Sequence, residues 1–183
     1  MDRTGLAFLT GFGLAWWLLG ASALGESLLP VAALAGVAVA AGVWRTGRDV
    51  RHPGGRPLPG DVRRRFVWIN ALQWLAIAAV VGGAEASGRP ELIFGLVAVV
   101  VGLHFLPVAA LFRQPRFHVT GTLMTATGAV GCVIGVAGES ASTVRMTVGV
   151  GAAVMLWGTA CLVRHKPTGP AEPSEAEEPV GTQ

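Results

Sequence analysis

The chain has 183 residues, of which 52% are hydrophobic and 14% are charged, and its mean hydropathy is +0.56. A soluble domain usually carries about 25% charged residues, so this composition excludes an ordinary soluble domain. The pI of about 9.7 does not indicate a nucleic-acid partner, because the basic residues follow membrane orientation and accompany no nucleic-acid-binding motif. The 13 arginines against one lysine are typical of a GC-rich bacterial genome.

Six apolar stretches account for most of the chain. Backbone groups in hydrocarbon must find hydrogen bonds within their own segment, so each stretch is expected to be a helix. A spanning helix needs ~20 residues, whereas the strands of a membrane barrel alternate over ~10 residues. We therefore predict an all-α polytopic membrane bundle of six transmembrane helices within residues 1–166. The helices are expected at about residues 5–23, 28–44, 66–84, 92–112, 119–137 and 143–163.

Residues 1–23 leave one alternative open. A short charged start, an apolar core and Ala21-Ser22-Ala23 also resemble a secretory signal peptide, whose cleavage would leave five helices. Asp2 in the charged start and the length of the apolar run favour a retained helix.

The basic residues gather in alternate gaps between the helices. Twelve lie on one side of the predicted membrane, whereas Arg89 and Arg145 lie on the other side beside four acids. Cytoplasmic loops carry the excess of arginine and lysine, so both termini are predicted to be cytoplasmic and the membrane to be the inner cell membrane. The twelve are Arg3, Arg45, Arg48, Arg51, Arg56, Arg63, Arg64, Arg65, Arg113, Arg116, Arg164 and Lys166.

The stretch 45–65 holds seven of these arginines together with several prolines and glycines. Such a composition predicts an irregular cytoplasmic loop, whose arginines contact the anionic headgroups of the bilayer. Residues 167–183 are rich in Pro, Glu, Gly and Thr. They carry too little apolar surface to fold and are expected to form a disordered cytoplasmic tail.

The six helices are expected to form three hairpins that turn on the outer side. Two-helix units in one orientation would be a parallel repeat, although shared membrane topology is an alternative explanation. Each outer turn contains an acid beside small residues: Gly25-Glu26-Ser27, Glu85-Ala86-Ser87 and Gly138-Glu139-Ser140.

Small residues recur every four positions along several predicted helices. Lipid provides no hydrophobic drive between helices, so small residues that let backbones approach become important. Packing inside the bundle is one interpretation, and self-association or docking of a membrane partner is the other. The rows are Ala7-Gly11-Ala15, Ala32-Gly36-Ala40, Thr127-Gly131-Gly135 and Thr143-Thr147-Gly151, with Gly95, Gly102 and Ala109 at seven-residue spacing.

Polar side chains inside apolar helices are costly and therefore mark candidate sites. Asn70 and Gln73 share a face of the third helix, and His104 in the fourth helix lies at a similar depth from the cytoplasmic ends. Pro107 is expected to kink the fourth helix and to free the carbonyl of Leu103. The predicted ligand-binding residues are His104, Gln73, Asn70, Thr122, Thr125 and Thr159.

Other chemistries have weaker support. A bis-histidine haem needs a second histidine at matching depth, and His118 lies at the interface. The sequence contains no catalytic triad, metalloprotease signature or phosphate loop, and Cys132 and Cys161 lack the spacing of metal ligands. We therefore expect no metal, no cofactor and no enzymatic activity.

One stretch of the fourth and fifth helices has a distinctive order: Gly102-Leu103-His104-Phe105-Leu106-Pro107, Ala109, Leu111-Phe112 and Val119-Thr120-Gly121. Together with Asn70 and Gln73-Trp74, it resembles a recurrent element of small uncharacterised multi-pass membrane proteins of bacteria. The resemblance implies the architecture and singles out His104 and Pro107, but it implies no known activity.

Two functions follow from these patterns. The first is an integral membrane protein that binds or transports a small solute through a cytoplasm-facing polar vestibule around His104. The second is a non-catalytic interaction or assembly subunit that packs through small-residue helix faces. Under the second, His104 bonds Gln73 or Asn70 and only ties helices together.

Overall fold

The computed structural model describes residues 3–47 and 59–162. These residues form α-helices and short 3-10 helices, without a strand in the described ranges, and six of the helices are long and apolar enough to cross a membrane. The predicted all-α class and the six membrane-spanning segments are confirmed to this extent. The helices are α1 (Arg3–Ala21), η1 (Ser22–Leu24), α2 (Leu29–Gly47), α3 (Gly60–Ala86), η2 (Pro90–Leu92), α4 (Ile93–Phe112), α5 (Pro115–Val136) and α6 (Ala141–Leu162).

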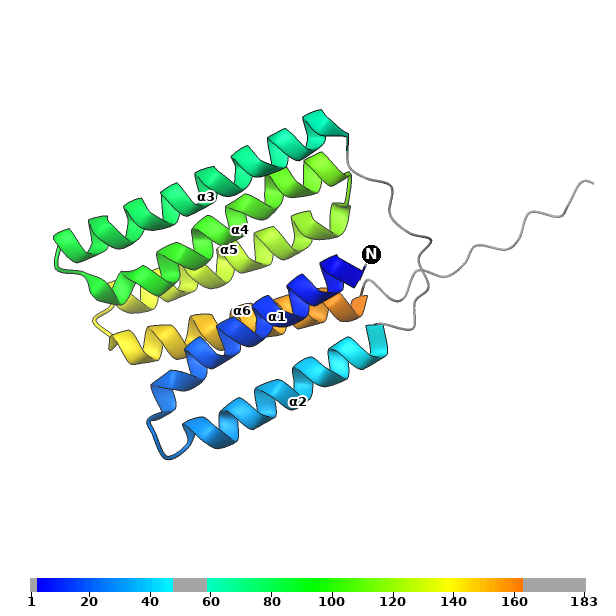
Figure 1. Ribbon diagram of the computed structural model, residues 1–183. Coiled ribbons are helices and arrows are strands. Elements are labelled where there is room, and N and C mark those ends of the chain that lie inside the picture. Colours follow the sequence, from blue (N-terminus) through cyan, green and yellow to red (C-terminus); the bar gives the residue numbers. More distant parts are fainter. Residues whose placement is uncertain (1–2, 48–58, 163–183) are drawn as a thin grey trace, which may run out of the picture.

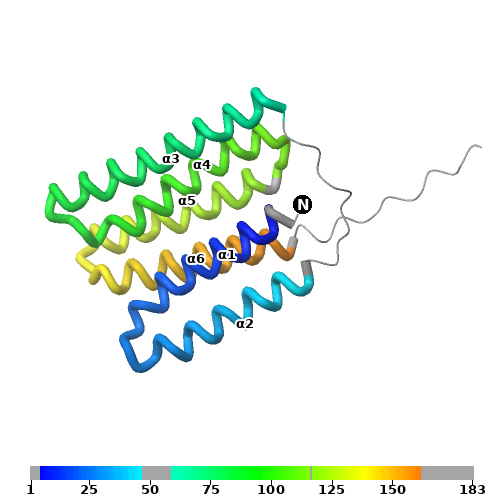
Figure 2. Tube along the Cα trace, viewed as in Figure 1, coloured from blue at the N-terminus to red at the C-terminus, as the bar shows by residue number. Residues whose placement is uncertain are grey.

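The helices lie side by side, with α2 and α3 at the two edges of the bundle (Figure 1). The path of the chain in Figure 2 shows that successive helices run in opposite directions. The most extensive helix contacts are those of α4 with α5 and of α1 with α6. Side chains from these four helices, together with Ala40 and Val43 of α2, form the buried core, which includes Leu9, Val101 and Leu156.

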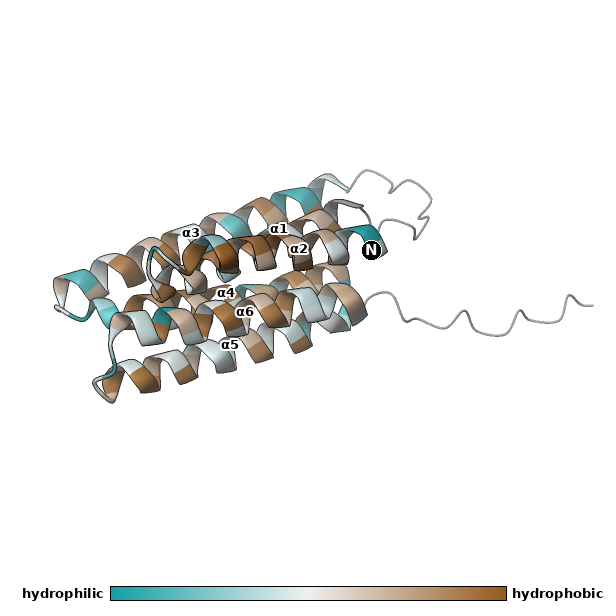
Figure 3. Cartoon of the chain, turned by 90° about the horizontal axis from the view of Figure 1, so that it is seen from below, coloured by the Kyte–Doolittle hydropathy of each residue, from teal (hydrophilic) through white to brown (hydrophobic). Residues whose placement is uncertain are grey.

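The outer surface of the bundle is apolar along most of its length. Hydrophobic residues cover the helices, and hydrophilic residues gather mostly towards the helix ends (Figure 3). On the two edge helices, Leu34 is 71% exposed and Trp74 is 68% exposed. Such exposure fits helices that are surrounded by hydrocarbon rather than by water.

Four helices, α1, α3, α5 and α6, begin earlier than the hydropathy pattern predicts, and local signals extend the last three. Arginines are good helix formers, and α3 already begins at Gly60, ahead of Arg63. Pro115 occupies the first turn of α5, where proline is favoured. The hydroxyl of Ser140 accepts the Thr143 N–H at 3.2 Å and caps the start of α6.

The prediction of one irregular loop over residues 45–65 is therefore wrong at both ends. Arg45 lies in the last turn of α2, and residues 60–65 belong to α3. Hydropathy alone missed these turns because charged residues continue a helix without adding to its apolar count. The middle of the expected loop, residues 48–58, and the expected tail, residues 167–183, lie outside the described residues.

Glycines bring the backbones of α4 and α5 into direct contact. A Cβ atom on Gly102 would lie 2.5 Å from the amide nitrogen of Thr125 and 2.8 Å from the carbonyl oxygen of Gly121. Two turns away, a Cβ atom on Gly95 would lie 2.9 Å from the carbonyl oxygen of Gly128. Any side chain at these positions would push the helices apart, so the small residues predicted at Gly95 and Gly102 pack within the bundle.

A second close crossing joins α1 to α6. A Cβ atom on Gly149 would lie 2.6 Å from the Cα atom of Gly20, so the two backbones touch there. One to two turns away, the indole of Trp157 covers Gly13 and donates a hydrogen bond from Nε1 to the Thr10 carbonyl at 3.2 Å.

Trp17 attaches α2 to α1. Its Nε1 donates to the carbonyl of Ala32 at 2.7 Å, and its ring lies against Gly36. The small residue at position 36 therefore accommodates an aromatic ring rather than another backbone.

Candidate functional site

The pairing of α3 with α4 is defined by two contacts. Near one end of the bundle, the rings of Phe66 and Phe112 meet edge to face with 5.6 Å between their centroids. Further along, the imidazole of His104 lies beside the backbone of Ile69. This antiparallel register brings Asn70 and Gln73 within about a turn of His104, because they follow Ile69 by one and four residues.

His104 presents an unpaired acceptor. The N–H of Ile69 is used within α3, so its carbonyl is the backbone group that can accept a bond from the imidazole. The Nδ1 atom is buried and has no hydrogen-bond partner within the described ranges. With the ring proton assigned to Nε2, the neutral ring keeps a lone pair on Nδ1. A buried acceptor of this kind is unfavourable until a donor reaches it.

The two amides of α3 supply further polar groups beside the imidazole. Asn70 donates from Nδ2 to the Phe66 carbonyl at 2.8 Å, one turn back in its own helix. Gln73 is half-buried, and no hydrogen bond links it to His104 in the part of the chain that the structure describes. The backbone of Ile69 is the part of α3 that lies beside His104, and a bond from His104 to either amide stays a prediction.

The three predicted threonines lie in three different surroundings. Thr122 is exposed on the outer surface of α5. Thr125 donates to the Gly121 carbonyl at 2.8 Å, beside the close contact of α5 with α4. Thr159 donates to the Met155 carbonyl at 2.8 Å within α6. These positions do not support a single polar layer that extends from His104 to all three hydroxyls.

Sequence reasoning missed the hydroxyl pair to which Thr159 belongs. Its Oγ1 lies 2.7 Å from the Oγ1 of Thr120, and both side chains are buried. A signal was present, because Thr120 lies four and eight residues before Met124 and Gly128 and therefore on the buried face of α5. The pair links α5 to α6 and is part of their packing.

Arg145 lies at the predicted outer end of the bundle, as the sequence suggested, one turn inside α6, where it is half-buried. Its guanidinium carbon lies 5.7 Å from the centroid of the Phe94 ring on α4, in a cation–π arrangement. Its place among apolar residues of the sixth helix was the available signal.

Helix α4 continues through Pro107 from Ile93 to Phe112. Proline has no N–H, so the carbonyl of Leu103, four residues back, receives no bond from it. This carbonyl directly precedes His104 and adds a second acceptor to the neighbourhood. The kink expected at Pro107 stays a prediction.

Within the described ranges, no group of three or more His, Cys, Asp or Glu side chains is placed to hold a metal ion. No protein family, curated protein or solved structure matches this chain. Its function has to be inferred from the chemistry of its own residues.

Proposed function

We propose that this protein is a non-enzymatic, multi-pass protein of the inner cell membrane that binds or transports a small solute at the contact between α3 and α4. The supporting observation is the Nδ1 atom of His104, which is buried and has no partner in the described residues. An acceptor of this type selects a solute with an N–H or O–H group, such as an amine, an amide or an alcohol.

The surrounding groups fit binding better than catalysis. Asn70 Oδ1, the Gln73 amide and the Leu103 carbonyl can orient a polar solute by further hydrogen bonds. A nucleophile with an adjacent base would be the signature of a covalent enzyme, whereas the polar side chains of α3 that follow Ile69 within about a turn are the amides Asn70 and Gln73. The site therefore needs no cofactor.

The attachment of α3 gives a solute a way to enter. Among the described elements, α3 has its main contacts with α4 and η2, and the side chain it buries is that of Ala84. Because α3 packs mainly against α4, small movements of α3 relative to α4 can expose or cover His104.

The proposed orientation places both termini in the cytoplasm and pairs the helices as three hairpins, α1–α2, α3–α4 and α5–α6. The concentration of arginine at one end of the bundle supports this orientation. Short turns at the opposite end join the members of each pair (Figure 1). We also group the protein with the small bacterial membrane proteins that share the element from Gly102 to Pro107.

Native mass spectrometry of protein released from mild detergent tests the solute site. The wild type should carry a reproducible non-lipid mass that His104→Ala loses. Thr159→Val serves as the matched control, because it removes a buried hydroxyl that is bonded elsewhere and should keep the mass. If all three proteins are bare, or if His104→Ala lowers only thermal stability, the solute site is wrong.

A second function, that of an assembly subunit, is favoured by one row of small residues. Ala7, Gly11 and Ala15 are exposed on α1, opposite its core-facing residues, and a Cβ atom on Gly11 would meet nothing within 4 Å. Rows of this spacing let membrane helices associate closely. This row is therefore available to a second copy or to another membrane protein.

Cross-linking and light scattering in detergent distinguish this function. Gly11→Leu should weaken association, whereas Gly158→Leu, at an exposed glycine of α6 with the same free space, should leave it unchanged. A wild-type protein that stays monomeric and captures no membrane partner would count against an assembly role.

A further inference from the structure

The end of the bundle at which α3 begins carries a cluster of exposed cations. Arg63, Arg64 and Arg65 are exposed on the second turn of α3, and Arg113 is exposed at the turn between α4 and α5. At this end, Asp61 is the one acid within the described ranges. We call the four arginines the basic patch.

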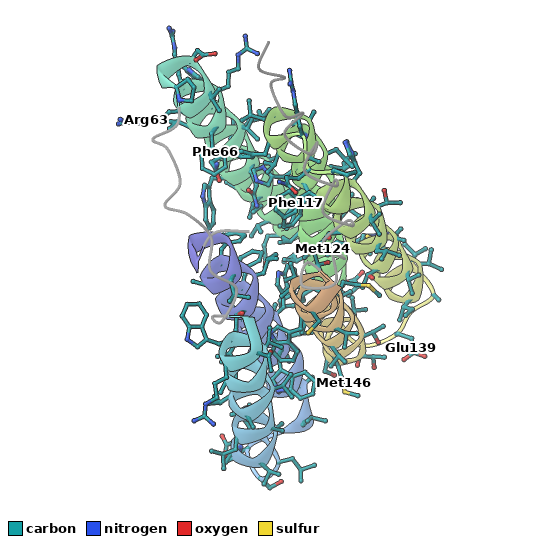
Figure 4. All side chains as sticks on the ribbon, turned by 90° about the vertical axis from the view of Figure 1, so that its right-hand side faces the viewer. Arg63, Phe66, Phe117, Met124, Glu139 and Met146 are labelled. Atoms are coloured by element: carbon teal, nitrogen blue, oxygen red, sulfur yellow. The ribbon has the colours of Figure 1, made fainter. Side chains whose placement is uncertain are left out.

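Aromatic contacts hold the parts of the basic patch together. The edge-to-face pair of Phe66 and Phe112 fastens the start of α3 to the end of α4. Phe66 directly follows Arg65, and Phe112 directly precedes Arg113, so the pair brings the two groups of arginines to one place. Figure 4 shows Arg63 and Phe66 on the first turns of α3.

Arg113 has a strained backbone. Its φ of 51° lies in the left-handed region, where it closes the end of α4. Glycine takes this position in most helix ends because it has no Cβ penalty. The backbone conformation at position 113 therefore favours glycine over arginine, so the arginine is not explained by local conformation alone.

Apolar surface begins directly beneath the cations. Val67 is 58% exposed and Trp68 is 66% exposed. They follow Arg65 in α3 by two and three residues. An anionic phospholipid matches this arrangement, because its phosphate can contact the arginines while its acyl chains contact the apolar side chains. A free phosphate ion or an acidic peptide would leave the exposed apolar side chains without a contact.

We infer that the basic patch binds the headgroup phosphate of an anionic phospholipid, whose acyl chains lie along Val67 and Trp68. Guanidinium groups suit this ligand because they present paired donors to phosphate oxygens. The inference rests on the proposed orientation and makes more specific the contact between arginines and anionic headgroups that the sequence predicts for residues 45–65. It is independent of the solute site at His104.

Lipid titration followed by native mass spectrometry tests the inference with full-length protein. The probes are phosphatidylglycerol and phosphatidylcholine with identical acyl chains. The wild type should retain phosphatidylglycerol preferentially. Each arginine near a membrane surface contributes about fivefold, so Arg64→Gln with Arg113→Gln should reduce the retention of phosphatidylglycerol about 25-fold. Arg89→Gln, an exposed arginine at the opposite end, is the matched control and should change nothing.

Two further measurements make the test specific. Arg113→Gly relaxes the backbone while removing one cation, so it should keep or raise thermal stability and still lower phosphatidylglycerol retention about fivefold. Inorganic phosphate at millimolar concentration should not displace the lipid. Equal retention by the double variant and Arg89→Gln would overturn the inference, and displacement by free phosphate would overturn the assignment to a lipid. Neither result would bear on the solute mass lost with His104→Ala.

Discussion

At the scale of single residues, the stability of this bundle depends on glycines at which two backbones touch. A membrane bundle gains little from hydrophobic burial, so the close contact of α4 with α5 at Gly102 has to supply dispersion energy instead. An added methyl group on Gly102 would meet the hydroxyl of Thr125 and also backbone atoms of Thr125 and Gly121, which cannot move aside as a flexible side chain can.

We expect Gly102→Ala to lower the free energy of unfolding by about 1–3 kcal/mol, the usual cost of overpacking. Gly158→Ala is the control, because a Cβ atom there would meet nothing within 4 Å. It should not lower stability, since alanine favours a helix more than glycine does. Thermal unfolding in one detergent compares the two variants. If Gly102→Ala were as stable as the control, then moving α4 away from α5 would not lower the free energy of unfolding, which would contradict this prediction.

At the scale of helices, α3 differs from the others. It is the longest α-helix of the described ranges, with 27 residues, and yet it buries little. The core of α6 includes Val148, Ala152 and Leu156, each 0% exposed. Few buried contacts give a helix a low local stability, and a helix that borders the proposed solute site is expected to be mobile.

Hydrogen–deuterium exchange in detergent should therefore show faster exchange in the middle of α3 than in the middle of α6. Phe66→Ala removes one of the two contacts that define the register, so it should accelerate exchange in α3 and leave α6 unchanged. Equal protection of the two helices in the wild type would contradict this ranking and would remove the proposed route of solute entry.

The length of α3 also shows where sequence patterns were insufficient. Hydropathy located the apolar part of each helix, but it could not extend α3 through Arg63, Arg64 and Arg65. Hydropathy also does not distinguish lipid-facing from core-facing residues, because Leu72 of α3 and Leu156 of α6 are equally apolar. One is 66% exposed and the other is 0% exposed. The most extensive helix contacts, those of α4 with α5 and of α1 with α6, were therefore not predicted from the sequence.

At the scale of the whole molecule, the alternation of helix directions places the turns at two ends. The turns that contain Gly25, Gly88 and Gly138 share one end, and each of these glycines has a positive φ. The turn at Arg113 lies at the other end, with the start of α1 (Figure 1). From the charge pattern we propose that the first end faces the outside of the cell.

Cysteine accessibility in intact cells tests this orientation. In a background with Cys132→Ala and Cys161→Ala, single cysteines at Ser27, Ser87 and Ser140 should react with a membrane-impermeant maleimide. Cysteines at Thr46 and Gln114 should react only after the cells are opened. The reverse pattern would invert the proposed topology. Labelling of Ser27 alone, without Ser87 and Ser140, would refute the arrangement as three hairpins.

The class of the protein and the number of its spanning helices could be predicted from sequence because the bilayer imposes them. Helix length follows from the thickness of hydrocarbon. The site could be predicted only in part. Counting depth placed His104 near Gln73, and the contact of His104 with Ile69 is compatible with that count. The count could not reveal that Thr159 bonds Thr120 or that Thr122 faces outward, because depth does not specify the direction of a side chain.

The solute site at His104 is the central claim, and its most direct test is nitrogen NMR of histidine-labelled protein in lipid nanodiscs. The chain has four histidines, so His104→Asn assigns the relevant signals. We expect a neutral ring protonated at Nε2, with an Nδ1 signal that shifts when amine or alcohol solutes are added. A proton on Nδ1, or an Nδ1 signal that no solute moves, would contradict the claim.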